Sequence, residues 1–138
     1  MLGRKTYTAE EMRRGRELVE AHLAAFRAVA ESAPAGEALS ALEERTATAA
    51  LLVLDRAFVH RLRAVEGKDT NPLTEVGLVA VSLVEHDGVM TPVKGIKYVP
   101  GAGVLGIAPG DRIRLTVGDT EKLASAFLAE LEARVAEA

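Results

Sequence analysis

The chain has 138 residues, of which 49% are hydrophobic and 4% aromatic, so we expect one domain with a core of leucine, valine and alanine. It contains no cysteine, which excludes disulfides, thiolate metal sites and thiol catalysis. Its net charge of −3 argues against a nucleic-acid or anionic-membrane binder, because such proteins usually carry a marked basic excess.

No targeting or membrane-spanning segment is predicted. The first residues lack the apolar core of a secretory signal, and no apolar run approaches the ~20 residues that cross a bilayer. We therefore expect a cytoplasmic protein. The alanine-rich composition, with arginine in excess over lysine, is typical of GC-rich bacterial genomes.

Two long amphipathic helices are predicted in the first half of the chain. Thr8 and Glu11 have the spacing of a capping box, and a helix is expected over residues 9–32. A second helix is expected over residues 37–66, which contain no proline or glycine, and Gly67 would end it. Its buried seam repeats at intervals of three and four residues, at Leu51, Leu54, Phe58, Leu62 and Val65.

A third helix, over residues 72–85, is apolar on nearly all sides. Asn71 suits its N-cap and Pro72 its first position. Such a helix is usually buried centrally or covered by a second subunit. Complete cover is difficult within a monomer of this size, so we expect a symmetric homodimer that buries part of the third or fourth helix.

Residues 88–118 differ from the rest because they contain seven glycines and three prolines. We expect a short β-hairpin or an irregular insertion here, with candidate strands at 96–99, 104–107 and 112–117. A last helix is expected over residues 119–136. The predicted fold class is mainly α: one four-helix bundle-like domain over residues 1–138, with this Gly/Pro-rich insertion between helices three and four.

Residues 101–106 match the G-x-G-x-x-G pattern of dinucleotide sites. Such a site needs a helix that opens on the third glycine within a βαβ unit, whereas Pro109 and Gly110 follow almost at once. We therefore interpret these glycines as tight turns and expect no cofactor.

The histidines do not have the spacing of metal sites. None of His22, His60 and His86 has a glutamate three residues before it, as di-iron bundle sites require. A His-Glu-x-x-His helix and a Gly-x-Ser-x-Gly nucleophile motif are also absent. We expect no metal and can name no catalytic residue.

Polar chemistry is concentrated in residues 60–72, between two strongly apolar segments. The basic side chains here, together with the backbone amides of residues 71–74 at a helix start, favour an anionic small molecule with a phosphate or carboxylate. The alternative is a solvated charged face and an ordinary helix–helix turn. The candidate ligand-binding residues are His60, Arg61, Arg63, Glu66, Lys68, Asp69 and Asn71.

A helical wheel places Asp55 and His22 on the buried faces of their helices. A buried carboxylate needs a partner, so we hypothesise that the two meet as a buried polar pair. The pair would be either a general base oriented by a carboxylate or a structural contact that sets the helix register.

Catalytic constellations are scarce in this chain, whereas helix-packing positions are abundant. We therefore expect a small soluble intracellular protein that acts as a dimeric interaction or structural module. The alternative is a ligand-binding protein or enzyme with an anionic small-molecule site at the turn between the second and third helices. Binding of DNA at this turn is disfavoured by the overall acidity.

Overall fold

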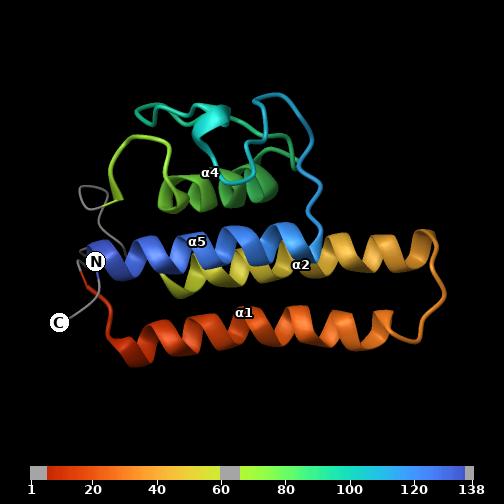
Figure 1. Cartoon of the computed structure of the whole chain (residues 1–138). Helices are drawn as coiled ribbons and strands as arrows, with labels where there is room; N and C mark the ends of the chain where they lie inside the picture. The colour runs from red at the N-terminus through yellow and green to blue at the C-terminus, as the bar shows by residue number, and fades with distance from the viewer. Residues whose placement is uncertain (1–5, 60–65, 136–138) are drawn as a thin grey trace.

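The helices of this computed structural model stack in layers beneath one long irregular segment (Figure 1). Residues 6–59 and 66–135 are described. α1 packs against α2 and α5, and these two helices in turn pack against α4. The mainly helical fold class is therefore confirmed for the described residues. The helices are α1 (Ala9–Ala30), α2 (Glu37–Ala57), α4 (Pro72–Glu85) and α5 (Val117–Val135), with one 3-10 turn, η1 (Pro100–Ala102).

The start of α1 follows from a local capping box. The backbone N–H of Glu11 donates to the hydroxyl of Thr8 at 3.1 Å, and the Glu11 carboxylate accepts from the backbone N–H of Thr8 at 3.1 Å. Two otherwise unpaired groups at the helix start are thus satisfied. The predicted capping box is confirmed.

α2 ends earlier than the sequence predicts, at Ala57 instead of residue 66. The next residue, Phe58, is buried, and its ring packs against Tyr7 at 5.0 Å and Phe127 at 5.8 Å between centroids. The backbone N–H of Phe58 donates to Asp55 at 3.3 Å, so the last turn of α2 is tightened. No glycine or proline marks this end, and residues 60–65 lie outside the described part of the chain.

α4 is the central helix of the molecule. Its residues Leu73, Val76 and Val79 have no exposed surface. α2 and α5 cover one side, and the segment of residues 86–116 covers the other (Figure 1). The cover that the sequence assigned to a second subunit is therefore supplied by the same chain, and the argument for a dimer that buries this helix does not hold. The half-buried side chains that pack against the core from this segment are Val93, Ile96, Tyr98, Val104, Leu105 and Ile107.

The covering segment is irregular, and the β-hairpin prediction is wrong. The described residues contain no strand, and only one isolated antiparallel bridge joins Val89 to Arg112. Beside this bridge, the backbone N–H of Ile113 donates to Gly88 at 2.7 Å. Positive φ angles at several glycines turn the chain too often for a strand to form. α5 then begins at Val117, two residues before the predicted start.

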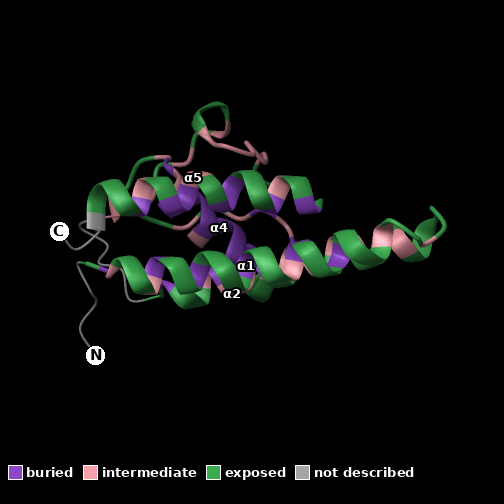
Figure 2. Cartoon of the chain, turned by 60° about the horizontal axis from the view of Figure 1, so that its bottom comes forward, coloured by how far each residue is buried: buried purple, intermediate pink, exposed green. Residues whose placement is uncertain are grey.

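The hairpin of α1 and α2 extends beyond the rest of the molecule (Figures 1 and 2). The backbone N–H at the start of α5, Val117, donates to the carboxylate of Glu43 at 3.0 Å. Residues 31–42, at the tip of the hairpin, therefore lie past the end of α5. Within the described residues, no helix is long and apolar enough to cross a membrane.

Candidate functional site

The polar turn before α4 is organised around Asn71, which is only 6% exposed. Its side-chain oxygen accepts from the backbone N–H groups of Leu73 at 2.9 Å and Thr74 at 3.2 Å. Its side-chain nitrogen donates to the carbonyl oxygen of Glu66 at 2.9 Å and to a carboxylate oxygen of Asp69 at 3.0 Å. Asn71 is therefore an N-cap that also closes the turn on itself.

The backbone amides of this helix start are already in use. The Thr74 hydroxyl accepts from the backbone N–H of Asn71 at 3.0 Å, and donates to the carbonyl oxygen of Asp69 at 2.7 Å. Pro72 has no N–H. Each amide of residues 71–74 that carries a hydrogen is thus bonded to Asn71 or Thr74. An anion at this helix start would have to displace the cap, so the geometry does not support the amide donors that the sequence suggested.

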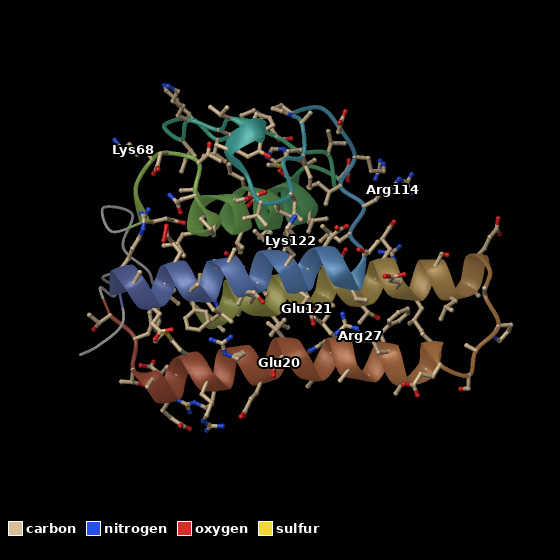
Figure 3. All side chains as sticks on the ribbon, viewed as in Figure 1. Glu20, Arg27, Lys68, Arg114, Glu121 and Lys122 are labelled. Atoms are coloured by element: carbon tan, nitrogen blue, oxygen red, sulfur yellow. The ribbon has the colours of Figure 1, made fainter. Side chains whose placement is uncertain are left out.

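Thr70 joins the polar turn to the covering segment. Its hydroxyl donates to the carbonyl oxygen of Lys97 at 2.9 Å and accepts from the backbone N–H of Val99 at 2.7 Å. The backbone N–H of Lys97 donates to the carbonyl oxygen of Lys68 at 2.7 Å. The turn therefore anchors one end of the cover over α4. The side chains of Lys68 and Asp69 are exposed, and Lys68 extends away from the helices (Figure 3).

The remaining candidates for the anionic site are placed only in part. Glu66 is half-buried, and its carbonyl oxygen also accepts from Arg134 at 3.0 Å. His60, Arg61 and Arg63 lie outside the described residues. Of the other candidates, Asn71 contacts Glu66 and Asp69, whereas the side chain of Lys68 points away from them (Figure 3).

His22 and Asp55 are half-buried, not buried, and this removes the premise of their pairing. Nδ1 of His22 lies 2.8 Å from the carbonyl oxygen of Leu18, one turn earlier in the same helix. No hydrogen bond or ion pair between His22 and Asp55 is found in the described part of the chain. The structure therefore does not support a buried polar pair at this helix interface.

A buried carboxylate that the sequence did not single out organises the covering segment. Glu75, on α4, is 1% exposed. One of its oxygens accepts from the backbone N–H of Val104 at 2.6 Å. The other accepts from the N–H groups of Leu105 at 2.9 Å and Gly106 at 3.3 Å. Three amide donors thus compensate the burial of one carboxylate.

The glycines of the G-x-G-x-x-G pattern allow this approach. A Cβ at Gly103 would lie 3.0 Å from an oxygen of Glu75. Gly106 has a φ of +64°, and a Cβ there would lie 2.8 Å from the carbonyl oxygen of Pro100. Successive amides that curve around an anion form a nest. Here the anion is the protein's own carboxylate, so the glycines serve an internal contact of the fold.

Tyr98 completes the environment of this carboxylate. Its hydroxyl donates to the carbonyl oxygen of Ile107 at 2.7 Å. Burial, and to a smaller extent the charge of Glu75, raise the pKa of Tyr98 to about 12. The side chain is therefore a neutral hydrogen-bond donor that ties the two ends of the glycine-rich loop together.

A cleft of about 310 Å³ opens between α4 and the covering segment, beside the polar turn. This volume is at the lower end of the usual range for ligand pockets, about 300–1,000 Å³. The polar residues that line the cleft are Glu66 and Thr74. The apolar walls are formed by Leu78, Val81, Val93 and Ile96, among others.

The outer face of the α1–α2 hairpin exposes large apolar side chains. Leu18 is 51% exposed, Val29 47% and Leu42 43%. An open groove of about 310 Å³ runs along this face, lined by Leu18, Leu52, Val53, Arg56 and Ala57. We refer to the surface formed by these seven residues as the hairpin face. In its groove, Leu18 of α1 meets Leu52 and Val53 of α2.

Comparisons with known proteins add no family or activity: no family model, curated protein or solved structure matches this chain. In the described residues, no group of three or more histidine, aspartate or glutamate side chains could hold a metal ion. The functional argument therefore depends on the surfaces described above.

Proposed function

We propose that this protein is a cytoplasmic interaction or structural module that acts as a homodimer. The observation that carries the proposal is the hairpin face, where Leu18, Val29 and Leu42 are each more than 40% exposed. Single exposed apolar residues are common, but a contiguous apolar surface usually marks a contact with another molecule.

The contrast with the polar turn supports this proposal. The backbone N–H groups at the start of α4 are hydrogen-bonded to the cap residue Asn71, and the carboxylate of Glu75 occupies the glycine-rich loop. The two motifs that most resembled ligand sites are thus explained by folding. The exposure of the apolar side chains on the hairpin face has no such explanation within one copy of the chain.

Sedimentation velocity across a wide range of protein concentration tests the proposal. We expect a dimer whose fraction rises with concentration, as mass action requires. A protein that sediments as a monomer at every concentration would rule out the proposed function.

The second candidate function is a ligand-binding protein or enzyme with an anionic small molecule at the polar turn. The cleft of about 310 Å³ beside Glu66 is the observation in its favour. Thermal-shift screening with phosphorylated and carboxylated metabolites tests it, because a ligand at 100 times its Kd adds about 2.7 kcal/mol of stability. The absence of any response across a broad panel would favour the interaction module.

A further inference from the structure

We infer that the hairpin face binds an amphipathic helix of a partner protein, in which aspartate or glutamate side chains flank an apolar stripe. This inference rests on the interaction module proposed above, and it names a second occupant of the same face, which competes with the second copy in the proposed dimer. The evidence is the shape of the groove, the spacing of the exposed apolar residues and the arginines that border them.

The groove in the hairpin face has the form of a helix-binding site. Leu18 of α1 faces Leu52 and Val53 of α2 across it. Val29 follows Leu18 by 11 residues, and Leu42 precedes Val53 by the same number, which is about three helical turns in each case. Because α1 and α2 form a hairpin, Val29 and Leu42 continue the apolar surface toward the tip (Figure 1). Its length of about 16 Å matches three turns of a partner helix.

Small side chains lie between the two ends of this surface. Ala25 follows Leu18 by seven residues and Ala49 precedes Val53 by four, so each alanine lies on the same side of its helix as the apolar residue. Both alanines are exposed. A surface that is low along its middle admits the side chains of a third helix, as in the packing of ridges into grooves.

Arginines border this surface. Arg56 lines the groove, and Arg14 precedes Leu18 by four residues, on the same side of α1. Both are exposed, and in the part of the chain that the structure describes neither guanidinium has a hydrogen bond or an ion pair. Arg45, about three turns before Arg56 on α2, extends this basic edge and also borders a polar pocket with Glu44. The surface is therefore basic, although the net charge of the chain is −3.

The carboxylates that could pair with Arg14 along α1 already have partners. Glu10 lies four residues before Arg14 and Glu17 three residues after it, and both bond to Arg13. Glu11 accepts the backbone N–H of the capping box. Arg14 is therefore left for a carboxylate of another molecule.

An acidic helix fits this surface better than a second copy does. A second copy presents the same arginines and the same bonded carboxylates, so an apolar contact between two copies leaves the guanidiniums of both unpaired. An acidic helix places carboxylates beside them, and arginine–carboxylate hydrogen bonds are strong and directional. The recessed groove also favours a helix over a flat lipid surface.

A pair of labelled synthetic peptides tests the inference. The first has about 15 residues, with leucines at helical intervals of three and four residues and glutamates beside them, and the second carries lysines in place of the glutamates. Fluorescence anisotropy should show binding of the glutamate peptide at least about tenfold tighter than that of the lysine peptide, and added salt should weaken it. Equal affinity for the two peptides would overturn the inference.

Two charge reversals on α1 form a matched pair. Arg14→Glu should weaken binding of the glutamate peptide about tenfold and strengthen binding of the lysine peptide. Arg16→Glu changes the net charge by the same amount, but Arg16 borders the groove between α1 and α5 on another side of the helix, so this variant should bind normally. Thermal melts verify that both variants are folded. An equal loss of affinity in the two variants would reduce the effect to net charge and overturn the inference.

The outcomes separate this inference from the proposed dimer. Sedimentation of the protein alone tests the dimer, whereas the peptides test the partner. A dimer that the glutamate peptide neither binds nor dissociates would overturn the inference and leave the proposed function standing. A monomer that binds this peptide through Arg14 would support the inference and overturn the homodimer. Binding to vesicles of phosphatidylserine and phosphatidylcholine that is lost in Arg14→Glu would assign the face to a membrane and overturn the inference.

Discussion

The backbone N–H of Val104 lies 2.6 Å from a carboxylate oxygen of Glu75, which is 29 residues earlier in the chain. This hydrogen bond and its two neighbours join the central helix to the segment that covers it. The cover contains no strand in the described residues, so it cannot depend on a ladder of its own. Three successive amides of the cover are thus held by one carboxylate of α4, and not by pairing with a neighbouring strand.

Replacement of Glu75 by alanine should destabilise the fold by about 3 kcal/mol or more. The change leaves three amides in the interior without their acceptor, and each unsatisfied donor costs about 1–3 kcal/mol. Glu75→Gln, which retains one acceptor oxygen, should cost less. Urea unfolding measures the free energy, and hydrogen exchange at residues 104–106 should accelerate before global unfolding. Equal stability of the alanine variant and the natural protein would contradict the role of Glu75.

Gly103→Ala should destabilise the protein by about 1–2 kcal/mol, because overpacking at close contacts carries costs of this size. The added Cβ would lie 3.0 Å from an oxygen of Glu75. Gly101→Ala is the matched control, since a Cβ at Gly101 would meet nothing within 4 Å. Thermal melts of the two variants should differ clearly. The same melting temperature for both would show that the approach of Gly103 to Glu75 is unimportant.

Gly15→Ala should destabilise the protein even though alanine favours helices by about 1 kcal/mol over glycine. The added Cβ would lie 2.6 Å from the ring of Phe58, and relief of this overlap costs about 1–3 kcal/mol. Gly118→Ala, in the first turn of α5, meets only an ordinary contact at 3.7 Å and should be neutral or stabilising. Chemical denaturation of both variants checks the opposite signs, and a gain in stability for Gly15→Ala would disprove the close contact.

Asn71→Ala should cost about 2 kcal/mol, because it removes a helix cap and leaves buried backbone groups without partners. Lys68→Ala, three residues earlier and exposed, should change stability by less than about 0.5 kcal/mol. Urea unfolding of the two variants distinguishes the structural residue from the solvated one. Equal effects would contradict the cap.

The Arg27–Glu121 ion pair should contribute little to the free energy of unfolding, and only at a pH at which Glu121 is ionised. The two side chains point toward one another between α1 and α5 at 2.9 Å, and each is about half exposed (Figure 3). The hydrogen bond from Arg27 lowers the pKa of Glu121 below its ordinary value of 4.5. Its stabilisation is therefore present above that value and is lost as the pH falls through the lowered pKa. A double-mutant cycle with alanine should give at most about 1 kcal/mol at neutral pH and nothing in strong acid.

The features that the sequence predicts well are local. The capping box of Thr8 and Glu11 and the cap at Asn71 depend on residues two or three positions apart, so their pattern is visible in the chain itself. The end of α2, in contrast, is not determined by neighbouring residues in the sequence. It coincides with a ring, Phe58, held by Tyr7 and Phe127 from distant parts of the sequence.

The role of Glu75 could not be predicted from spacing. In the sequence, a lone glutamate in an apolar helix only interrupts the apolar pattern and indicates no partner. Its partners lie 29 to 31 residues later, in a segment without helical or strand periodicity. The enclosure of α4 depends on the same segment. Without knowledge of this cover, a second subunit was the simplest way to bury the helix. Glycine spacing around residue 103 was the one available signal for a close backbone approach to an anion.

The enclosure of α4 has a consequence for the order in which the protein is made. The α1–α2 hairpin can close as soon as residue 57 has left the ribosome, since its two helices are neighbours in sequence. α4 emerges next, but its cover reaches residue 116 and α5 follows only after that. The cover is complete 31 residues after the end of α4, and α5 is complete 50 residues after it, so the most apolar helix of the chain is synthesised well before these two layers. This interval, and not the finished structure, is where we expect the chain to depend on chaperones and to be most prone to aggregation.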